Sequence, residues 1–335
     1  MKGIAASLFL QITIWAQTAP VVLSIDVENR VFYQFDISDY LKLASEPVRT
    51  NPPAVKTFAS TLGIADIVAI NGKPARGTWT LRATVVNLGG GCQCGPEPVS
   101  AASGTAIADT TRNNYLDVVW DILTPDGNPV GSIMASGASG GMPAPGSPLV
   151  VTNSDLAITG GTGAFLGMRG QGGLAQVLAA DRRASMSEDP SMRRVYGGGA
   201  RRIVLLLLPL IRPEVIVTAN GPDVFHSTDF GLVTSARPAR QGEILSAFAT
   251  GLGPTRPGVD PGTPFPSQPI HQVNSPVEVT VNGKSADVLG AAGSPGSIGG
   301  YQVNFRVPED TASGTATVRL SSAWIPGPEL KIAIQ

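Results

Sequence analysis

The chain has 335 residues, more than a single hydrophobic core usually serves, so two domains are expected. It contains 40 Gly and 28 Pro but only 15% charged residues, a composition that disfavours long helices and indicates a turn-rich, all-β protein. The 24 Lys and Arg residues nearly balance the 25 Asp and Glu residues, so neither nucleic acid nor an anionic membrane surface is an expected partner.

The first twenty residues have the three parts of a secretory signal. Lys2 precedes an apolar run at residues 3–15, and small residues follow at Ala16 and Ala19. A buried first strand is the alternative, and the run is too short to span a bilayer. We therefore expect residues 1–16 to be a signal peptide and the protein to be secreted, to the medium or the cell surface. No later apolar segment is long enough for a membrane span.

Alternating residues predict the first strands of the mature chain. Residues 21–27 and 31–37 read as two strands joined by a turn at Glu28 and Asn29. Tyr33 and Phe35 share one face of the second strand, and Asp36 lies on the other. A hairpin follows, in which residues 64–70 and 78–88 flank an Asn71-Gly72 turn.

A second hairpin is predicted from residues 114–123 and 130–136, which flank a turn at 125–129 rich in Pro, Asp, Gly and Asn. Trp120 lies on one face of its first strand. Tyr115, Asp117 and Asp121 lie on the other.

Three further strands at residues 156–159, 170–178 and 202–208 complete the predicted front domain. Between the last two, residues 181–199 read as a long charged and glycine-rich connection. A basic patch is conceivable in this region, but acidic neighbours favour a solvated loop. The arginines concerned are Arg182, Arg183, Arg193, Arg194, Arg201 and Arg202.

Pro209 and Pro213 bracket a stiff connector, so we place a linker at 209–213 between a front domain at 17–208 and a rear domain at 214–335. Seven short strands in about 120 residues are typical of a small sandwich. They are expected at 215–218, 244–250, 277–281, 285–289, 301–307, 315–321 and 330–334.

A glycine-rich motif lies near the end of the front domain. A dinucleotide-binding fingerprint is excluded because Leu166 stands where its third glycine should be. The segment closely resembles the glycine turn of the allene oxide cyclase and dirigent barrel superfamily, with Met168 in place of the usual alanine. The expected turn residues are Gly160, Gly161, Thr162, Gly163 and Phe165. The resemblance implies an antiparallel β-barrel, often trimeric, with an apolar cavity that guides cyclisation of a lipid epoxide or coupling of phenolic radicals.

The rear domain resembles the uncharacterised C-terminal immunoglobulin-like domain of many secreted bacterial proteins. The resemblance rests on residues 242–255, 279–284 and 301–308. It implies a β-sandwich that serves as an attachment or spacer module. The expected fold is therefore an antiparallel barrel followed by an immunoglobulin-like sandwich.

Two cysteines and two histidines limit metal and nucleophile chemistry. Cys92 and Cys94 could bind metal, stay unpaired or close a local disulfide, and an oxidising compartment favours the disulfide. Zinc needs three or four ligands, and His226 and His271 fall in the other domain, where we expect both at the surface. No metal, cofactor or Ser-His-Asp triad is therefore expected.

The remaining candidates for chemistry are carboxylates and aromatics on the barrel strands. Asp36, Asp117 and Asp121 would suit proton transfer if their faces lined a cavity, and would be ordinary solvated groups if they pointed outward. A hydrophobic ligand would contact aromatic side chains, for which the candidates are Tyr33, Phe35, Tyr115 and Trp120.

Two functional hypotheses follow from the sequence. The first is a non-catalytic secreted binding or structural protein, which we favour because no catalytic constellation is defined. The alternative is a barrel that binds a small hydrophobic lipid or phenolic molecule and guides its reaction, with isomerase-like, cyclase-like or dirigent-like stereocontrol. Fold alone does not decide between them.

Overall fold

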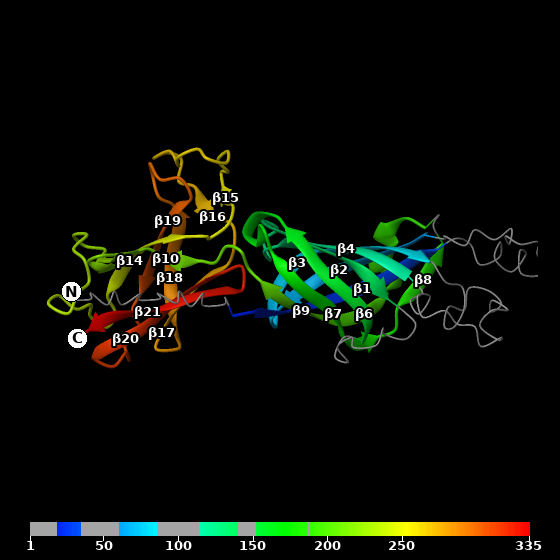
Figure 1. Cartoon of the computed structure of the whole chain (residues 1–335), viewed down its shortest axis with the longest axis horizontal. Helices are drawn as coiled ribbons and strands as arrows, with labels where there is room; N and C mark the ends of the chain where they lie inside the picture. The colour runs from blue at the N-terminus through cyan, green and yellow to red at the C-terminus, as the bar shows by residue number, and fades with distance from the viewer. Residues whose placement is uncertain (1–18, 35–59, 86–113, 140–151, 186–187) are drawn as a thin grey trace, which may run out of the picture.

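The computed structural model describes residues 19–34, 60–85, 114–139, 152–185 and 188–335, and these are almost entirely β-structure (Figure 1). The predicted all-β class is confirmed. The predicted signal peptide, Asp36, Phe35, Cys92 and Cys94 lie outside the described residues. The front strands are β1 Val21–Gln34, β2 Ser60–Ile70, β3 Lys73–Val85, β4 Asn114–Leu123, β5 Pro129–Ser139, β6 Thr152–Gly161, β7 Arg169–Ala179, β8 Arg182–Ser185 and β9 Gly199–Leu208.

The front sheet closes on itself. Each strand from β2 to β6 pairs with the next one along the chain. Strand β7 pairs with β9, and β1 pairs with both β9 and β2. These eight strands form a closed antiparallel barrel, and β8 adds a short parallel pairing beside the end of β1. Closure gives every barrel strand a partner on both sides, so the barrel wall has no free edge strand.

Both predicted hairpins are present. Asn71 and Gly72 have φ values of 50° and 74°, the left-handed pair that a two-residue turn requires, and Ile70 pairs with Lys73 across it. Strands β4 and β5 flank the second turn, with Leu123 opposite Pro129. These turns were predictable because their conformations depend on local residue types.

The prediction that a turn at Glu28 and Asn29 separates two strands is wrong. β1 is one strand that runs through this point, and its register with β2 shifts between Glu28 and Val31. Asn29 has a φ of 53°, so the signal that suggested a turn marks a β-bulge. Beyond it, Val31 and Tyr33 are buried.

The glycine motif connects two antiparallel neighbours. β6 pairs with β7, and a single 3-10 turn, η2 Gly163–Phe165, lies between them. Gly163 has a φ of 60°, and a Cβ there would lie 2.4 Å from the carbonyl oxygen of Val130. Phe165 is fully buried. The motif therefore has no strand-to-helix geometry of the dinucleotide type.

The predicted connection at 181–199 is more ordered than a loop. It contains β8, the 3-10 turn η3 Pro190–Met192 and one helical turn, α3 Arg193–Tyr196. The expectation of solvated arginines is wrong for Arg193 and Arg201, which are 7% and 9% exposed. Arg193 pairs with Asp66, 127 residues away, so the local composition gave no sign of that pairing, whereas Arg201 pairs with Asp181 at the start of the connection itself.

Inward-facing side chains of the barrel belong to one continuous apolar cluster. The cluster also contains Ala323, from the turn between β20 Gly314–Ser322 and β21 Ile325–Ile334, and Ile325, the first residue of β21, with Trp324 packed against it. Ala323 and Trp324 have φ values of 50° and 61°, a conformation that costs non-glycine residues about 1–2 kcal/mol each. The packing of this turn against the barrel offsets that cost.

The second sheet, of ten strands, surrounds a core of its own. Its main path runs β10-β14-β19-β18-β17-β20-β21, and β18 pairs with β17 through its first residues and with β19 through the rest. The strand segments are β10 Glu214–Val215, β13 Val224–His226, β14 Ile244–Thr250, β15 Thr255–Arg256, β16 Gln272–Val273, β17 Val277–Val281, β18 Lys284–Gly293, β19 Gly300–Arg306, β20 and β21, beside a separate pair of β11 Val217–Thr218 and β12 Gly221–Pro222.

Most of the predicted rear strands coincide with these segments. The prediction missed β12, β13, β15 and β16, which have two or three residues each and are too short to show an alternating pattern. Within the described ranges, none of the helical segments has the length and apolar character needed to cross a membrane.

Candidate functional site

The two described acidic candidates lie on the outer wall of the barrel. Asp117 and Asp121 are exposed on β4, on the face opposite the buried Trp120. Asp117 Oδ2 accepts a hydrogen bond from Arg82 Nη2 at 2.8 Å, and its Oδ1 accepts one from Ser136 Oγ at 3.0 Å. These bonds lower the pKa of Asp117. A carboxylate held ionised in solvent has the properties of a surface ion pair.

The described aromatic candidates lie on different surfaces. Trp120 points into the barrel and is 1% exposed, whereas Tyr115 is 61% exposed on the outer wall. Tyr33 is covered by the segment that contains η3, with its hydroxyl 3.4 Å from the Pro190 carbonyl oxygen. Burial raises the pKa of Tyr33. The structure does not bring these three side chains together into one pocket.

A buried ion-pair cluster lies inside one end of the barrel. Asp181 accepts hydrogen bonds from Arg30 Nη1 at 2.5 Å and from Arg201 Nη2 at 2.6 Å. The Arg30 guanidinium also lies 4.5 Å and 4.4 Å from the ring centroids of Phe32 and Trp79, close enough for cation–π attraction. Burial lowers the pKa of Arg30, against the opposing attraction of Asp181. The bulge in β1 is what places Arg30 on this inner face.

A second carboxylate anchors the α3 segment to the outer barrel wall. Asp66 on β2 accepts hydrogen bonds from Arg193 Nη2 at 2.5 Å, Arg194 Nη2 at 2.7 Å and Asn29 Nδ2 at 3.1 Å. Burial alone would raise the pKa of Asp66, but these hydrogen bonds outweigh it and lower the pKa. A hollow of about 720 Å³ adjoins this cluster. Because the carboxylate is already fully engaged, we assign the cluster a structural role.

Both histidines are buried, so the expectation that they lie at the surface is wrong. His226 and His271 are each 4% exposed. His226 Nδ1 lies 2.6 Å from Glu243 Oε1, and His271 Nδ1 lies 2.7 Å from the Pro257 carbonyl oxygen. The residues around each histidine show no alternation that would have predicted burial, because His226 lies on a strand of three residues and His271 lies beside one of two. Each therefore fixes a loop of the second sheet.

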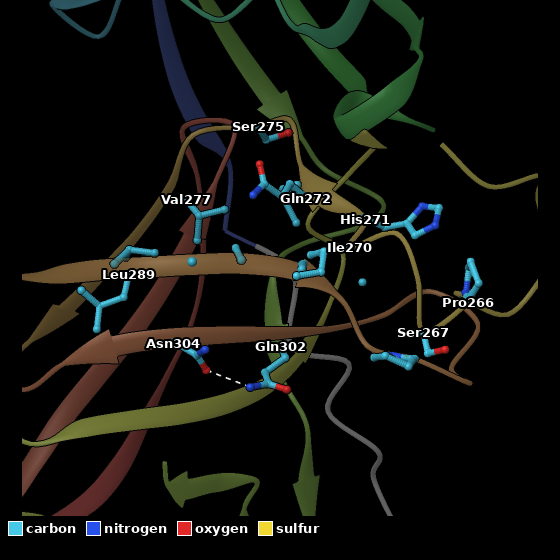
Figure 2. Close-up of a pocket in the computed structure, with 17 residues that line it drawn as sticks. Pro266, Ser267, Ile270, His271, Gln272, Ser275, Val277, Leu289, Gln302 and Asn304 are labelled. Carbon is cyan, nitrogen blue, oxygen red and sulfur yellow. Dashed lines mark hydrogen bonds between the residues drawn. The ribbon is translucent and has the colours of Figure 1, made fainter. Parts of the chain in front are cut away.

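The strongest candidate for a binding site is a groove of about 660 Å³ on the second sheet (Figure 2). One wall follows β18 from Val288 to Gly293, and the other is formed by the stretch from Ile270 to Val277. On β19, Gln302 Nε2 donates a hydrogen bond to Asn304 Oδ1 at 2.9 Å. Sequence reasoning missed this groove because its walls come from non-consecutive strands.

The groove is uncharged and partly apolar. None of its lining residues is Asp, Glu, Lys or Arg. Ile270 and Leu289 are 61% and 52% exposed, so apolar surface is available to a ligand. A concave surface that combines apolar side chains with a few placed polar groups is typical of a ligand-binding site.

Metal ligation finds no support in the described segments, where no three His, Cys, Asp or Glu side chains group closely enough to hold an ion. The groove likewise contains no acid–base pair. The arrangement can bind a ligand by shape, apolar contact and hydrogen bonds.

Comparisons with known proteins identify no relative of this chain. No family model matches it, and no curated protein matches it. Among solved structures, it has a low similarity to the N-terminal domain of the Streptococcus gordonii adhesin Sgo0707, with 9% identity and a TM-score of 0.18 over 94% of this chain and 92% of that chain. A TM-score this low gives no basis for transferring a property.

Proposed function

We propose that this chain is a secreted, non-catalytic binding protein in which the barrel is a rigid scaffold and the groove on the second sheet holds the ligand. The observation that carries the proposal is the uncharged groove with two exposed apolar side chains, Ile270 and Leu289. The signal-like N-terminus and the resemblance of residues 214–335 to modules of secreted bacterial proteins support export. The resemblance of residues 17–208 to dirigent-like barrels supports a scaffold of the same type.

The test is a binding screen with a structural readout. The purified full chain is mixed with arrays of peptides, glycans, lipids and phenolics, and amide hydrogen exchange is measured for β16, β18 and β19. We expect a bound class to slow exchange in these strands. Leu289→Asp should weaken that binding at least tenfold, because it places a charge in an uncharged groove.

Ile298→Asp is the matched control. Ile298 is 63% exposed and does not line the groove, so the same change there should leave binding intact. Equal losses in both variants, or a ligand that protects only barrel residues, would contradict a groove-based function. Export is tested separately, by asking whether residues 1–20 direct a reporter protein out of the cell.

The alternative function, a barrel that binds a small hydrophobic molecule, is favoured by one observation. Trp120 Nε1 is buried inside the barrel without a hydrogen-bond partner in the described structure. A ligand acceptor within the barrel would satisfy it. Mass spectrometry of the purified chain for a co-purifying lipid or phenolic tests this, and a specific turnover lost in Asp117→Asn or Asp121→Asn would replace the non-catalytic proposal.

Self-association through the barrel is part of the proposal. Val22 and Leu206 are cross-strand partners on its outer wall and are 57% and 44% exposed, with Leu208 nearby at 48%. Apolar side chains grouped in this way favour a protein contact. Sedimentation of the full chain should show an oligomer, which Leu206→Asp should reduce to monomers.

A further inference from the structure

The groove follows an interrupted edge of the second sheet. On the side of β18 that faces the groove, β17 pairs as far as Ala286 and β16 pairs at Ala292. Within the described chain, the five residues 287–291 between these points have no strand partner on this side. On its other side, β18 pairs with β19 from Asp287 to Gly293, with a register shift between Val288 and Gly290. This side of β18 therefore has a short unpaired stretch between two paired ones, and its residues from Val288 to Ala291 line the groove.

The backbone of Ala291 directs hydrogen-bonding groups into the gap. The N–H of Gly293 donates to the His271 carbonyl oxygen at 2.8 Å, so residue 293 faces the β16 side. Alternate residues of a strand direct their N–H and C=O groups to the same side, so Ala291 presents its own groups there. Space is available, because Val288 to Gly293 line the groove of about 660 Å³.

We infer that the ligand is an extended, uncharged peptide segment that adds to β18 as a strand between β16 and β17. This inference rests on the proposed function. Five residues of strand span about 17 Å, which suits a peptide of similar length. Both existing neighbours on this edge run antiparallel to β18, so the guest strand would do the same. Strand addition supplies affinity through main-chain hydrogen bonds, and alternate side chains supply specificity.

The chemistry of the groove favours a peptide over the other ligand classes. Its lining contains no Phe, Tyr or Trp, and the imidazole of His271 is only 4% exposed, so a flat ring would find little aromatic surface on which to stack. The absence of charged lining residues excludes an ionic anchor for an acidic or basic ligand. Leu289 and Val277 offer apolar contacts to alternate peptide side chains, and Gln302 and Asn304 offer polar ones.

The decisive experiment selects peptides and then methylates their backbones. A displayed library of uncharged seven-residue peptides is panned against the full chain, and enriched peptides are synthesised for calorimetry. Each is also made with N-methyl groups on its odd or on its even residues. Strand addition predicts that one set loses binding about tenfold or more, because two or more hydrogen bonds are lost, while the other set binds normally.

A protein variant provides the complementary test. Ala291→Pro removes the edge-facing N–H without removing a β18–β19 hydrogen bond, and it should weaken binding to a similar extent. Ala291→Ser retains the N–H and should bind normally. Thermal melting of both variants shows whether the sheet is intact, and the methylated peptides test the inference even if Ala291→Pro does not fold.

Three results would overturn the inference. Equal effects of the two methylation sets would mean that the peptide binds without forming a strand. Failure to enrich any peptide, combined with glycan or lipid protection of β18, would refute the peptide inference and leave the groove-based function standing. Failure of every ligand class to protect β18 would refute both.

Discussion

The barrel and the second sheet differ in how they complete their strand pairing. In the barrel, β1 pairs with β2 on one side and β9 on the other, so the wall is closed. In the second sheet, β18 is shared between β17 and β19, and its edge is open for residues 287–291. Closed pairing gives stability without offering backbone groups to a partner, whereas an interrupted edge offers them. The comparison assigns scaffolding to the barrel and binding to the second sheet.

The two regions also differ in the use of charge. The barrel encloses Arg30 and Arg201 around Asp181 at one end, with side chains no more than 17% exposed. The groove of the second sheet has no charged lining residue. Buried ion pairs tolerate little change, because removing one partner leaves the other charge uncompensated. The barrel should therefore be sensitive at these residues and the groove tolerant of neutral changes.

The largest expected effect is the loss of the shared carboxylate. Asp181→Asn leaves two buried guanidinium groups without a counter-charge, and we expect it to lower the free energy of unfolding by about 3–5 kcal/mol. Chemical denaturation of the full chain measures this. The matched control is Asp229→Asn, whose ion pair with Arg237 is half-exposed, and it should change stability by less than about 1 kcal/mol. Similar losses in both variants would show that the barrel cluster is no more important than a surface pair.

The next effect concerns the contact between the two regions. Ile325 is 2% exposed and belongs to the barrel's apolar cluster although it begins β21. Ile325→Ala should cost about 2–4 kcal/mol through the cavity it leaves, and it should separate one unfolding transition into two. Calorimetry follows both quantities. A single transition with unchanged cooperativity would mean that the turn at Ala323 and Trp324 does not couple the two regions.

A smaller effect is expected from acid. The pKa of Asp66 is lowered in the folded state by Arg194, Arg193 and Asn29. The stability that these bonds contribute is therefore present above the unfolded-state pKa of about 4 and is lost as the pH falls through the lower folded-state pKa. Denaturation curves between pH 6 and pH 2 should show the loss, and Asp66→Asn should reduce it. An unchanged pH dependence in that variant would assign acid sensitivity to other carboxylates.

The sequence predicted what depends on local residue types. The Asn71-Gly72 turn, the alternation that buries Trp120, and strands such as residues 244–250 all follow from short-range patterns. The burial of Arg193 was not predictable, because its partner Asp66 lies 127 residues away. The sequence predicts a turn at Asn29 where the structure has a bulge, because asparagine is favoured at the positive φ that both features use.

The candidate groove was beyond sequence reasoning for a related reason. Its walls come from β16, β18 and β19, and β16 has only two residues. One signal was present, because Gln302 and Asn304 alternate with buried Tyr301, Val303 and Phe305 and so had to lie on the outer face. Alternation shows that polar side chains face outward, but it does not show that a neighbouring edge is open.

The smallest expected effect bears on the assignment of the barrel as a scaffold. Asp117→Asn removes an exposed ion pair with Arg82 and should change the free energy of unfolding by less than about 1 kcal/mol. It should also leave ligand binding at the groove unchanged, because the side chain lies on the outer wall of β4. Calorimetry and the peptide-binding assay check both statements. If Asp117→Asn abolished a ligand-dependent signal while stability stayed constant, the outer wall of the barrel would carry function, and the division of roles between the two regions would fail.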